Sequence, residues 1–294
     1  MSWLKGTIVL LFGILVGIGS AYYIVDRFGP SNLHVCPKFI SQIVNKTNQQ
    51  AEPEANYVPD KIVQNNSEFA SKRSAILMYH HIKINTQPNN AVERGLDVAP
   101  AMFEKQMDML SRMGYKAVTL KQMTQFVDGK NTISQNIAIT FDDGYDDIYT
   151  QAYPIMKKYG FVGTIYLIVD SIDKPGYMTK EQVKELIDAG FELGSHTLNH
   201  PNLANANLNN AKSQIETSKA RLDKMFMYDV TSFCYPSGKY NDQVVKLIKG
   251  AGYSSAVTTA EGYVVPKSDL LRLPRLRVSG SAKFSDFVAK IFSI

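Results

Sequence analysis

The chain has 294 residues and two cysteines, Cys36 and Cys234, so we do not expect a disulfide framework, even in an oxidising compartment. No Cys-His-Asn arrangement surrounds Cys234, which is therefore expected to be a small buried residue rather than a nucleophile. The net charge of +5 favours approach to an anionic cell surface, but it is too diffuse to indicate a protein that binds nucleic acid.

The first segment with a clear pattern is an uncharged, mostly apolar stretch at residues 6–25. About twenty such residues match the hydrocarbon core of a bilayer. We therefore expect residues 1–25 to form a single-pass anchor in the cell membrane, with Lys5 in the cytoplasm and the rest of the chain outside the cell. The alternative is a cleaved signal peptide, with small residues at 19–21 for processing, which would make the protein secreted.

An extracellular tether is expected at residues 26–73, which are rich in Asn, Gln, Ser and Lys and carry scattered prolines. The apolar positions at residues 39–44 allow one short helix within it. A tether of this kind lets a catalytic domain reach away from the membrane.

Beyond the tether, residues 74–294 alternate short apolar runs with helical patterns, as at residues 102–113 and 180–189. The methionines of the first helical pattern suit core packing. Alternation of strands and helices favours parallel pairing, so we predict one large α/β domain with barrel-like closure. The predicted strands are residues 75–79, 117–120, 137–140, 163–168, 191–194, 231–234, 255–258 and 272–278.

Two adjacent carboxylates, Asp142 and Asp143, follow the apolar strand at residues 137–140. Neighbouring residues at a strand end point in different directions, so one carboxylate can bind a cation while the other handles a proton. Gly144 then lets the chain turn sharply away. An isolated pair of this kind is typical of a solvated turn, so a second motif must support the interpretation.

The second motif is a pair of histidines, His196 and His200, after the predicted strand at residues 191–194. A single helical turn at this spacing would bring both imidazoles onto one face. Two histidines and one carboxylate form a common ligand set for a catalytic divalent metal with an open position. Because active sites gather at the carboxyl ends of strands in α/β folds, we predict that the two motifs form one metal site.

Residues 140–144 (Thr-Phe-Asp-Asp-Gly) and 196–200 (His-Thr-Leu-Asn-His) together resemble the signature of the polysaccharide deacetylases, carbohydrate esterase family 4 or the NodB-homology domain. The resemblance covers residues 74–290 approximately. It implies a distorted (β/α) barrel and the removal of acetyl groups from N-acetylated sugars, or less often of O-acetyl groups from xylan.

Carried over residue by residue, the resemblance implies that Asp143, His196 and His200 bind the metal and that Asp142 is the general base. The cofactor would be a divalent ion of the Zn²⁺ type, with Co²⁺ or Ni²⁺ as alternatives. A backbone N–H for the oxyanion would come from the proline-containing loop, Tyr235, Pro236 and Ser237.

One position departs from the family pattern, because Cys234 stands where many members carry an arginine that pairs with the catalytic base. The basic strand at residues 272–278 offers a substitute, and we expect Arg275 to hold Asp142. Arg277 is a rival, since alternate residues of a strand share one face.

The general acid raises a similar question, because many family members supply a histidine near the carboxyl end and no histidine follows His200 here. Residues 79–80 (Tyr-His) resemble an amino-terminal element of the poly-N-acetylglucosamine deacetylase branch. That match implies that His80 protonates the leaving amine. His81 should point the other way, and we expect a structural role for it.

Together, the resemblance and the expected membrane anchor imply a metal-dependent N-deacetylase that acts on a cell-surface polymer, either poly-N-acetylglucosamine or peptidoglycan. An O-acetyl esterase acting on xylan or another glycan is the alternative enzyme, and an inactive glycan-binding module is the other class. Four tyrosines beside strand ends are candidates for stacking on sugars or for packing: Tyr145, Tyr166, Tyr235 and Tyr240.

Overall fold

The structure is a computed structural model that describes residues 73–129 and 135–292. The predicted anchor at residues 1–25, the short helix at 39–44 and almost all of the tether lie outside the described residues. Within the described ranges, no helix combines the length and the apolar character that a membrane span requires.

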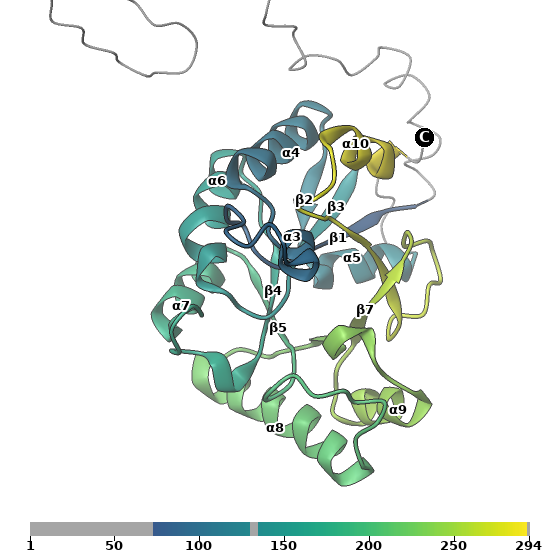
Figure 1. Ribbon diagram of the computed structural model, residues 1–294. Helices are drawn as coiled ribbons and strands as arrows, with labels where there is room; N and C mark the ends of the chain where they lie inside the picture. Colours follow the sequence, from purple (N-terminus) through teal and green to yellow (C-terminus); the bar gives the residue numbers. More distant parts are fainter. Residues whose placement is uncertain (1–72, 130–134, 293–294) are drawn as a thin grey trace, which may run out of the picture. The chain divides into compact units, whose positions relative to one another are not determined.

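Parallel strands form the centre of the fold (Figure 1). Seven of the described strands close into a barrel in the order β1-β8-β7-β6-β5-β4-β3, because β3 also pairs with β1, while β2 adds to β3 outside this ring. The predicted parallel, barrel-like α/β fold is therefore confirmed. The strands are β1 (Ala75–Tyr79), β2 (Lys116–Val118), β3 (Asn136–Phe141), β4 (Thr164–Leu167), β5 (Glu192–Ser195), β6 (Ser232–Cys234), β7 (Ser255–Glu261) and β8 (Leu273–Arg277).

Helices surround the barrel in Figure 1, with α4, α6 and α7 on one side and α8 and α9 on another. The predicted helices at residues 102–113 and 180–189 correspond to α4 and α7. The described helices are α3 (Ala91–Leu96), α4 (Pro100–Arg112), α5 (Leu120–Val127), α6 (Tyr153–Lys158), α7 (Lys180–Asp188), α8 (Leu208–Phe226), α9 (Asp242–Gly250) and α10 (Phe284–Phe292), with the short helical segments η1 (Ile148–Ala152), η2 (Val169–Ser171) and η3 (Pro236–Gly238).

The predicted strand at residues 117–120 is wrong at its end, because Leu120 begins α5. A capping box explains the early start of this helix. The Thr119 side chain accepts a hydrogen bond from the Gln122 N–H, and the Gln122 side chain accepts one from the Thr119 N–H. The capping box satisfies backbone donors that the first turn of a helix leaves unpaired. Its stabilisation of the helix start outweighs the strand preference of the preceding apolar residues.

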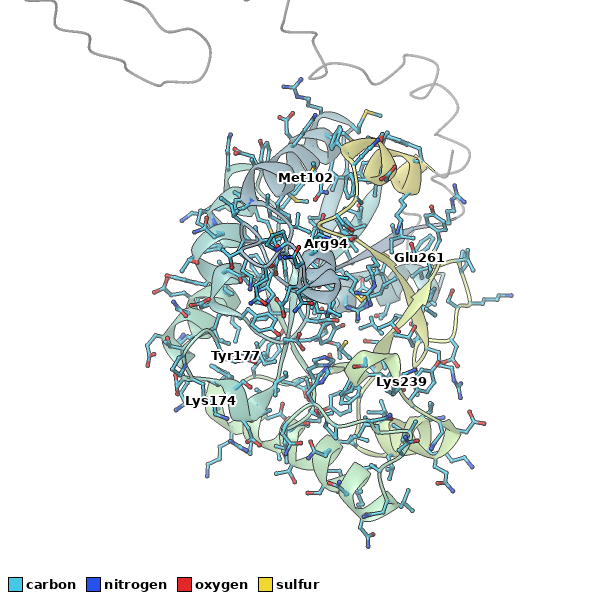
Figure 2. All side chains as sticks on the ribbon, viewed as in Figure 1. Arg94, Met102, Lys174, Tyr177, Lys239 and Glu261 are labelled. Carbon is cyan, nitrogen blue, oxygen red and sulfur yellow. The ribbon has the colours of Figure 1, made fainter. Side chains whose placement is uncertain are left out.

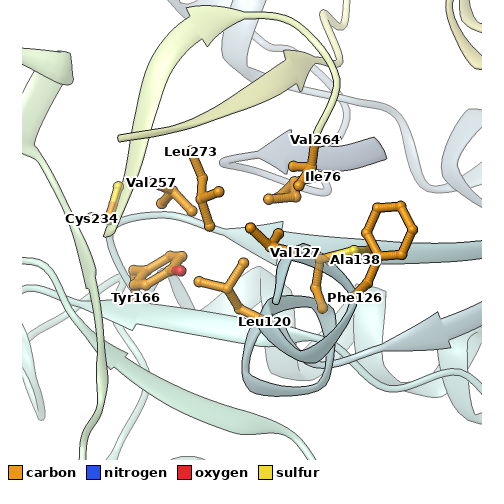
Figure 3. Close-up of a cluster of buried hydrophobic side chains, with 11 residues drawn as sticks. Ile76, Leu120, Phe126, Val127, Ala138, Tyr166, Cys234, Val257, Val264 and Leu273 are labelled. Atoms are coloured by element: carbon orange, nitrogen blue, oxygen red, sulfur yellow. The ribbon is translucent and has the colours of Figure 1, made fainter. Parts of the chain in front are cut away.

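Helix α5 packs against the amino-terminal ends of the strands. Its first two backbone N–H groups donate to Thr164 Oγ1 at 2.9 Å and to the Glu192 carboxylate at 2.7 Å, at the starts of β4 and β5. Apolar side chains of α5 join a buried cluster with residues from six barrel strands (Figure 3). The cluster contains Ile76, Leu120, Met123, Phe126, Val127, Ala138, Tyr166, Cys234, Val257, Val264 and Leu273.

Strand register aligns the carboxyl ends at the opposite rim. Tyr79 of β1 pairs with Phe141 of β3, and Leu167 of β4 pairs with Ser195 of β5. The residue after each strand therefore reaches the same edge, and the Asp142 N–H donates to the Tyr79 carbonyl at 3.0 Å. In this way the register gathers side chains that are far apart in the sequence.

Replacing Gly194 by Ala should destabilise the barrel. A Cβ at this position would lie 2.4 Å from the Tyr166 ring and 2.8 Å from Ser232 Oγ, so neighbouring side chains must shift. Overpacking of this kind costs about 1–3 kcal/mol. The urea midpoint should fall with an unchanged m-value, whereas Gly250→Ala, with nothing within 4 Å of the new Cβ, should leave the midpoint unchanged or raise it. Equal midpoints for Gly194→Ala and the unmodified protein would contradict this account.

Candidate active site and metal centre

Backbone geometry separates the two adjacent carboxylates at the end of β3. Asp143 has a φ of 72° and Gly144 a φ of 86°, both in the left-handed region. A Cβ at residue 144 would lie 2.8 Å from a Leu167 methyl carbon, so glycine is required for space as well as for conformation. The chain thus turns sharply after Asp142, and the side chains of Asp142 and Asp143 reach different partners.

Asp143, His196 and His200 form a compact set of possible metal ligands, with one ligand atom from each within 4.8 Å of the others. Asp143 Oδ1 lies 3.4 Å from His196 Nε2 and 3.7 Å from His200 Nε2. Ligand atoms at about 2.1 Å from a tetrahedral Zn²⁺ lie roughly 3.4 Å apart. The donor types and their separations therefore fit a divalent cation of this kind.

A hydrogen bond fixes the orientation of the His196 ring, whose Nδ1 lies 2.7 Å from the Cys234 carbonyl oxygen. Donation from Nδ1–H to this carbonyl leaves Nε2 facing Asp143 as the ligand atom. Burial lowers the pKa of His196, but the contacts with Cys234 and Asp143 outweigh it and raise that pKa overall. A proton therefore competes with a cation for His196 Nε2.

The segment carrying the two histidines is a turn, so the expectation of a helical turn is wrong. Thr197 and His200 have φ values of 69° and 60°, which no right-handed helix contains. Side chains stabilise this turn, because Gln214 of α8 accepts from the Leu198 N–H and Thr197 Oγ1 accepts from the His200 N–H. The rings still meet at a centroid distance of 4.8 Å.

The His200 side chain is one-third exposed, with a relative accessibility of 33%. Burial and the neighbouring His196 lower the pKa of His200, which favours the neutral imidazole that binds metals. This exposed edge leaves an approach from solvent to the ligand set.

Asp142 forms a buried bidentate ion pair with Arg275 of β8. The two guanidinium nitrogens donate to the two carboxylate oxygens, each at 2.7 Å. Burial alone would raise the pKa of the Asp142 carboxyl, but the Arg275 guanidinium lowers it well below its usual range. The structure therefore places the expected arginine against Asp142 and keeps this carboxylate ionised at neutral pH.

Arg277, the rival arginine, is half-exposed, and its backbone N–H donates to Glu261 at 3.3 Å. The two arginines differ because Arg275 lies inside the barrel, whereas Arg277 is at the last position of β8. Cys234 is buried as expected, and its Sγ lies 3.3 Å from an Arg275 nitrogen and 3.5 Å from Asp142 Oδ2. Its small thiol thus leaves room for the guanidinium that arrives from β8.

His80 lies beside the ion pair, with Nε2 at 3.9 Å from Asp142 Oδ2 and a side chain that is 15% exposed. Burial lowers the pKa of His80, although the Asp142 and Asp143 carboxylates oppose this shift. His81 has different partners from His80. Its Nδ1 lies 2.5 Å from the Asp147 carboxylate, and its ring stacks on Tyr145.

Of the three predicted loop residues, Tyr235 donates its N–H to the Val257 carbonyl at 3.2 Å, and Pro236 has no N–H. Ser237 is therefore the loop residue whose backbone N–H remains for an oxyanion, and it is exposed with a φ of 51°. Tyr166 and Tyr235 are fully buried, so packing is the correct interpretation for both. Tyr240 stacks on Tyr235 at 4.2 Å.

Asp147 and Tyr177 belong to this region but were missed in the sequence. Asp147 follows the Asp142 motif by five residues, so its proximity to the strand end was a usable signal. Tyr177 lies on the segment between η2 and α7, and it reaches Tyr145 through an isolated antiparallel bridge. Nothing in the sequence pattern indicates a bridge between two irregular segments.

Replacing Arg275 by Met should destabilise the protein by about 3–5 kcal/mol, because Asp142 would remain as a buried charge without its partner. Arg277→Met, on the same strand, should change stability by no more than about 0.5 kcal/mol. Urea unfolding at pH 7 measures both. Equal losses for the two variants would contradict the assignment of Arg275.

The pH dependence gives a second test of the same pair. The lowered pKa of Asp142 stabilises the folded protein above the unfolded-state pKa of about 4, and this contribution is lost as the pH falls through the folded-state value. In Arg275→Met, burial without the guanidinium would raise the pKa of Asp142, so acid relieves the penalty. The stability deficit of the variant should therefore shrink as the pH is lowered.

Comparisons with known proteins agree with this geometry. The family model for polysaccharide deacetylase matches residues 129–256. YxkH of Bacillus subtilis strain 168, whose name assigns it to the polysaccharide deacetylases, is 36% identical over 220 residues, which are 74% of this chain and 76% of that protein. The poly-beta-1,6-N-acetyl-D-glucosamine N-deacetylase of Staphylococcus epidermidis is 26% identical over 83% of this chain and 92% of that protein.

Among solved structures, the Streptococcus pyogenes deacetylase PplD in complex with acetate superposes with a TM-score of 0.70 and 29% identity. The match covers 74% of this chain and 98% of PplD. Barrel, motifs and relatives agree, and the chain belongs to the polysaccharide deacetylase family.

Proposed function

We propose that the protein is a metal-dependent hydrolase that removes N-acetyl groups from N-acetylglucosamine residues of a cell-surface polysaccharide. One observation carries the proposal: the two adjacent carboxylates have different partners. Asp143 faces two histidines, whereas Asp142 is paired with Arg275 and lies beside His80. One side of the site thus offers metal ligands, and the other offers groups that transfer protons.

The choice of polymer rests on the relatives. The Staphylococcus epidermidis protein is named as a poly-beta-1,6-N-acetyl-D-glucosamine N-deacetylase, and the match spans 92% of its length. We therefore favour poly-N-acetylglucosamine over peptidoglycan. An anchor at residues 1–25 and a tether at residues 26–73 would hold the catalytic domain outside the cell, where both polymers are found.

Asp143, His196 and His200 would hold the cation, and their nitrogen and oxygen donors suit Zn²⁺, with Co²⁺ and Ni²⁺ as alternatives. When bound, such an ion supplies a Lewis acid that polarises the acetyl carbonyl and acidifies the attacking water. The partly exposed His200 lies on the side from which a sugar reaches these ligands.

Asp142 accepts the proton of the attacking water. Arg275 keeps this carboxylate ionised and oriented, because both of its oxygens accept from the guanidinium. The Ser237 N–H stabilises the oxyanion that forms from the acetyl carbonyl. His80 then protonates the departing amine. Burial lowers the pKa of His80, which makes its imidazolium a stronger acid, and the Asp142 carboxylate at 3.9 Å opposes this shift and helps the ring hold the proton that it donates.

The full-length protein should release acetate from N-acetylglucosamine oligomers, and a chelator should abolish this release. Restoring Zn²⁺ or Co²⁺ should restore it, since the ligand set accepts both ions. Acetate is measured enzymatically, with acetylated xylan as the parallel substrate. Release from xylan alone would assign an O-acetyl esterase instead, and no release from either polymer by the metal-loaded protein would indicate a binding module.

Replacing Asp142 by Asn should lower turnover by about 10²- to 10⁴-fold while the protein retains its metal, because the variant removes a proton acceptor and leaves the ligands intact. His196→Ala should lose both metal and turnover. Elemental analysis after dialysis gives the metal content, and urea unfolding shows whether each variant is folded. If Asp142→Asn kept most of its activity, Asp142 would not be the base.

A further inference from the structure

A hollow opens directly beside the proposed metal ligands. Asp143 and His200 line one side of it, Tyr145 and Tyr177 line another, and Ser171 and Lys174 add polar groups from the segment between β4 and α7. Its volume of about 390 Å³ falls within the range of ligand pockets, about 300–1,000 Å³. A ligand in this hollow would therefore lie next to the part of the substrate that reaches the proposed metal ligands.

We propose that this hollow is a second saccharide subsite, in which the sugar next to the one being deacetylated stacks on the ring of Tyr177. The inference rests on the proposed function. It adds that the bound polymer extends from the metal site toward the segment between β4 and α7.

Tyr177 is held in place by a stack of three rings. Tyr145 lies between His81 and Tyr177, with centroid distances of 3.6 Å and 5.1 Å and interplanar angles of 23° and 27°. The stack is fixed at its inner end, because the His81 ring contacts the Asp147 carboxylate. Tyr177 is only half-buried, so it presents the remaining surface of its ring to the hollow.

Backbone hydrogen bonds tie the Tyr177 segment to the catalytic motif. The Met178 N–H donates to the Gly144 carbonyl at 3.0 Å, and the Asp146 N–H donates to the Gly176 carbonyl at 3.1 Å. Between them, Tyr145 and Tyr177 form the isolated bridge. An aromatic ring that is already fixed loses little conformational entropy when a ligand binds, which favours its use as a stacking surface.

The chemistry of the hollow fits a neutral pyranose, which has an apolar face of C–H groups and a rim of hydroxyls. The tyrosine rings provide an apolar surface for the C–H face of the sugar. The Ser171, Lys174 and Asn199 side chains provide hydrogen-bonding groups for its hydroxyls. Figure 2 shows Lys174 and Tyr177 close together at the same edge of the domain. The lining has two acidic residues: Asp143 belongs to the proposed metal ligands, and Asp170 is paired with Arg221 at 2.5 Å, so its charge is compensated.

The subsite predicts that activity depends on chain length, and Tyr177→Ala tests it with the full-length protein. For the tetramer of N-acetylglucosamine, KM should rise about three- to tenfold with little change in kcat, the pattern of lost uniform binding. For the monosaccharide, which leaves the subsite empty, the variant should match the unmodified protein. Tyr177→Phe keeps the ring and should behave like the unmodified protein.

Tyr149→Ala is the matched control, because Tyr149 is also a half-buried tyrosine in a stacked pair, with Tyr153 at 5.9 Å, but it lies in η1 outside the lining of the hollow. This control should leave the tetramer KM unchanged. The same chain-length profile in Tyr177→Ala as in the unmodified protein would overturn the subsite.

Direct binding separates failure of the subsite from failure of the proposed function. The tetramer is titrated calorimetrically into the unmodified protein and into Tyr177→Ala. If no oligomer is deacetylated, the proposed function fails. Weaker binding of the tetramer by Tyr177→Ala than by the unmodified protein would still support the subsite. Equal affinities for both proteins would overturn it, whatever the acetate assay shows.

Discussion

A single buried guanidinium connects four strands of the barrel. Arg275 of β8 donates to Asp142 at the end of β3, to the Thr258 carbonyl of β7 and to Thr140 Oγ1 of β3, and it contacts the thiol of Cys234 in β6. Burying such a charge is unfavourable unless every donor finds an acceptor. The site therefore tolerates few changes at these positions, because each one would leave a buried charge or a buried donor unpaired.

The same interaction explains how Asp142 finds a cationic partner although residue 234 is not an arginine. A carboxylate buried at the end of β3 needs a cationic partner, and the partner's position in the chain matters less than its position in the barrel. Since the barrel closes through β1, which pairs with both β3 and β8, Arg275 of β8 lies close enough to reach Asp142 at the end of β3. A small residue at 234 is then a requirement, because a second long side chain would occupy the space of the guanidinium.

Structural features that depend on neighbouring residues could be predicted from the sequence more completely than features that depend on contacts between distant parts of the chain. Buried parallel strands are continuous apolar runs, so residues 75–79 were predicted with the bounds that β1 has. The family resemblance indicated that Asp142 needs an arginine partner, and the basic strand at residues 272–278 offered two, but the choice between Arg275 and Arg277 required knowing which of them lies inside the barrel. Alternation along a strand gives the face and not the depth.

The histidine turn and Tyr177 lay beyond sequence reasoning for a different reason. A spacing of four residues suggests a helical turn, yet Thr197 and His200 adopt left-handed conformations that contacts with Gln214 and Thr197 Oγ1 stabilise. A tertiary contact with α8 and a hydrogen bond within the turn thus override the local preference for a helix. Tyr177 meets Tyr145 through backbone pairing of two irregular segments, which no periodic pattern records. Among the described residues, eight other than glycine have a positive φ, and four of these lie at this rim: Asp143, Thr197, His200 and Ser237. Each such conformation costs energy that the surrounding contacts must offset.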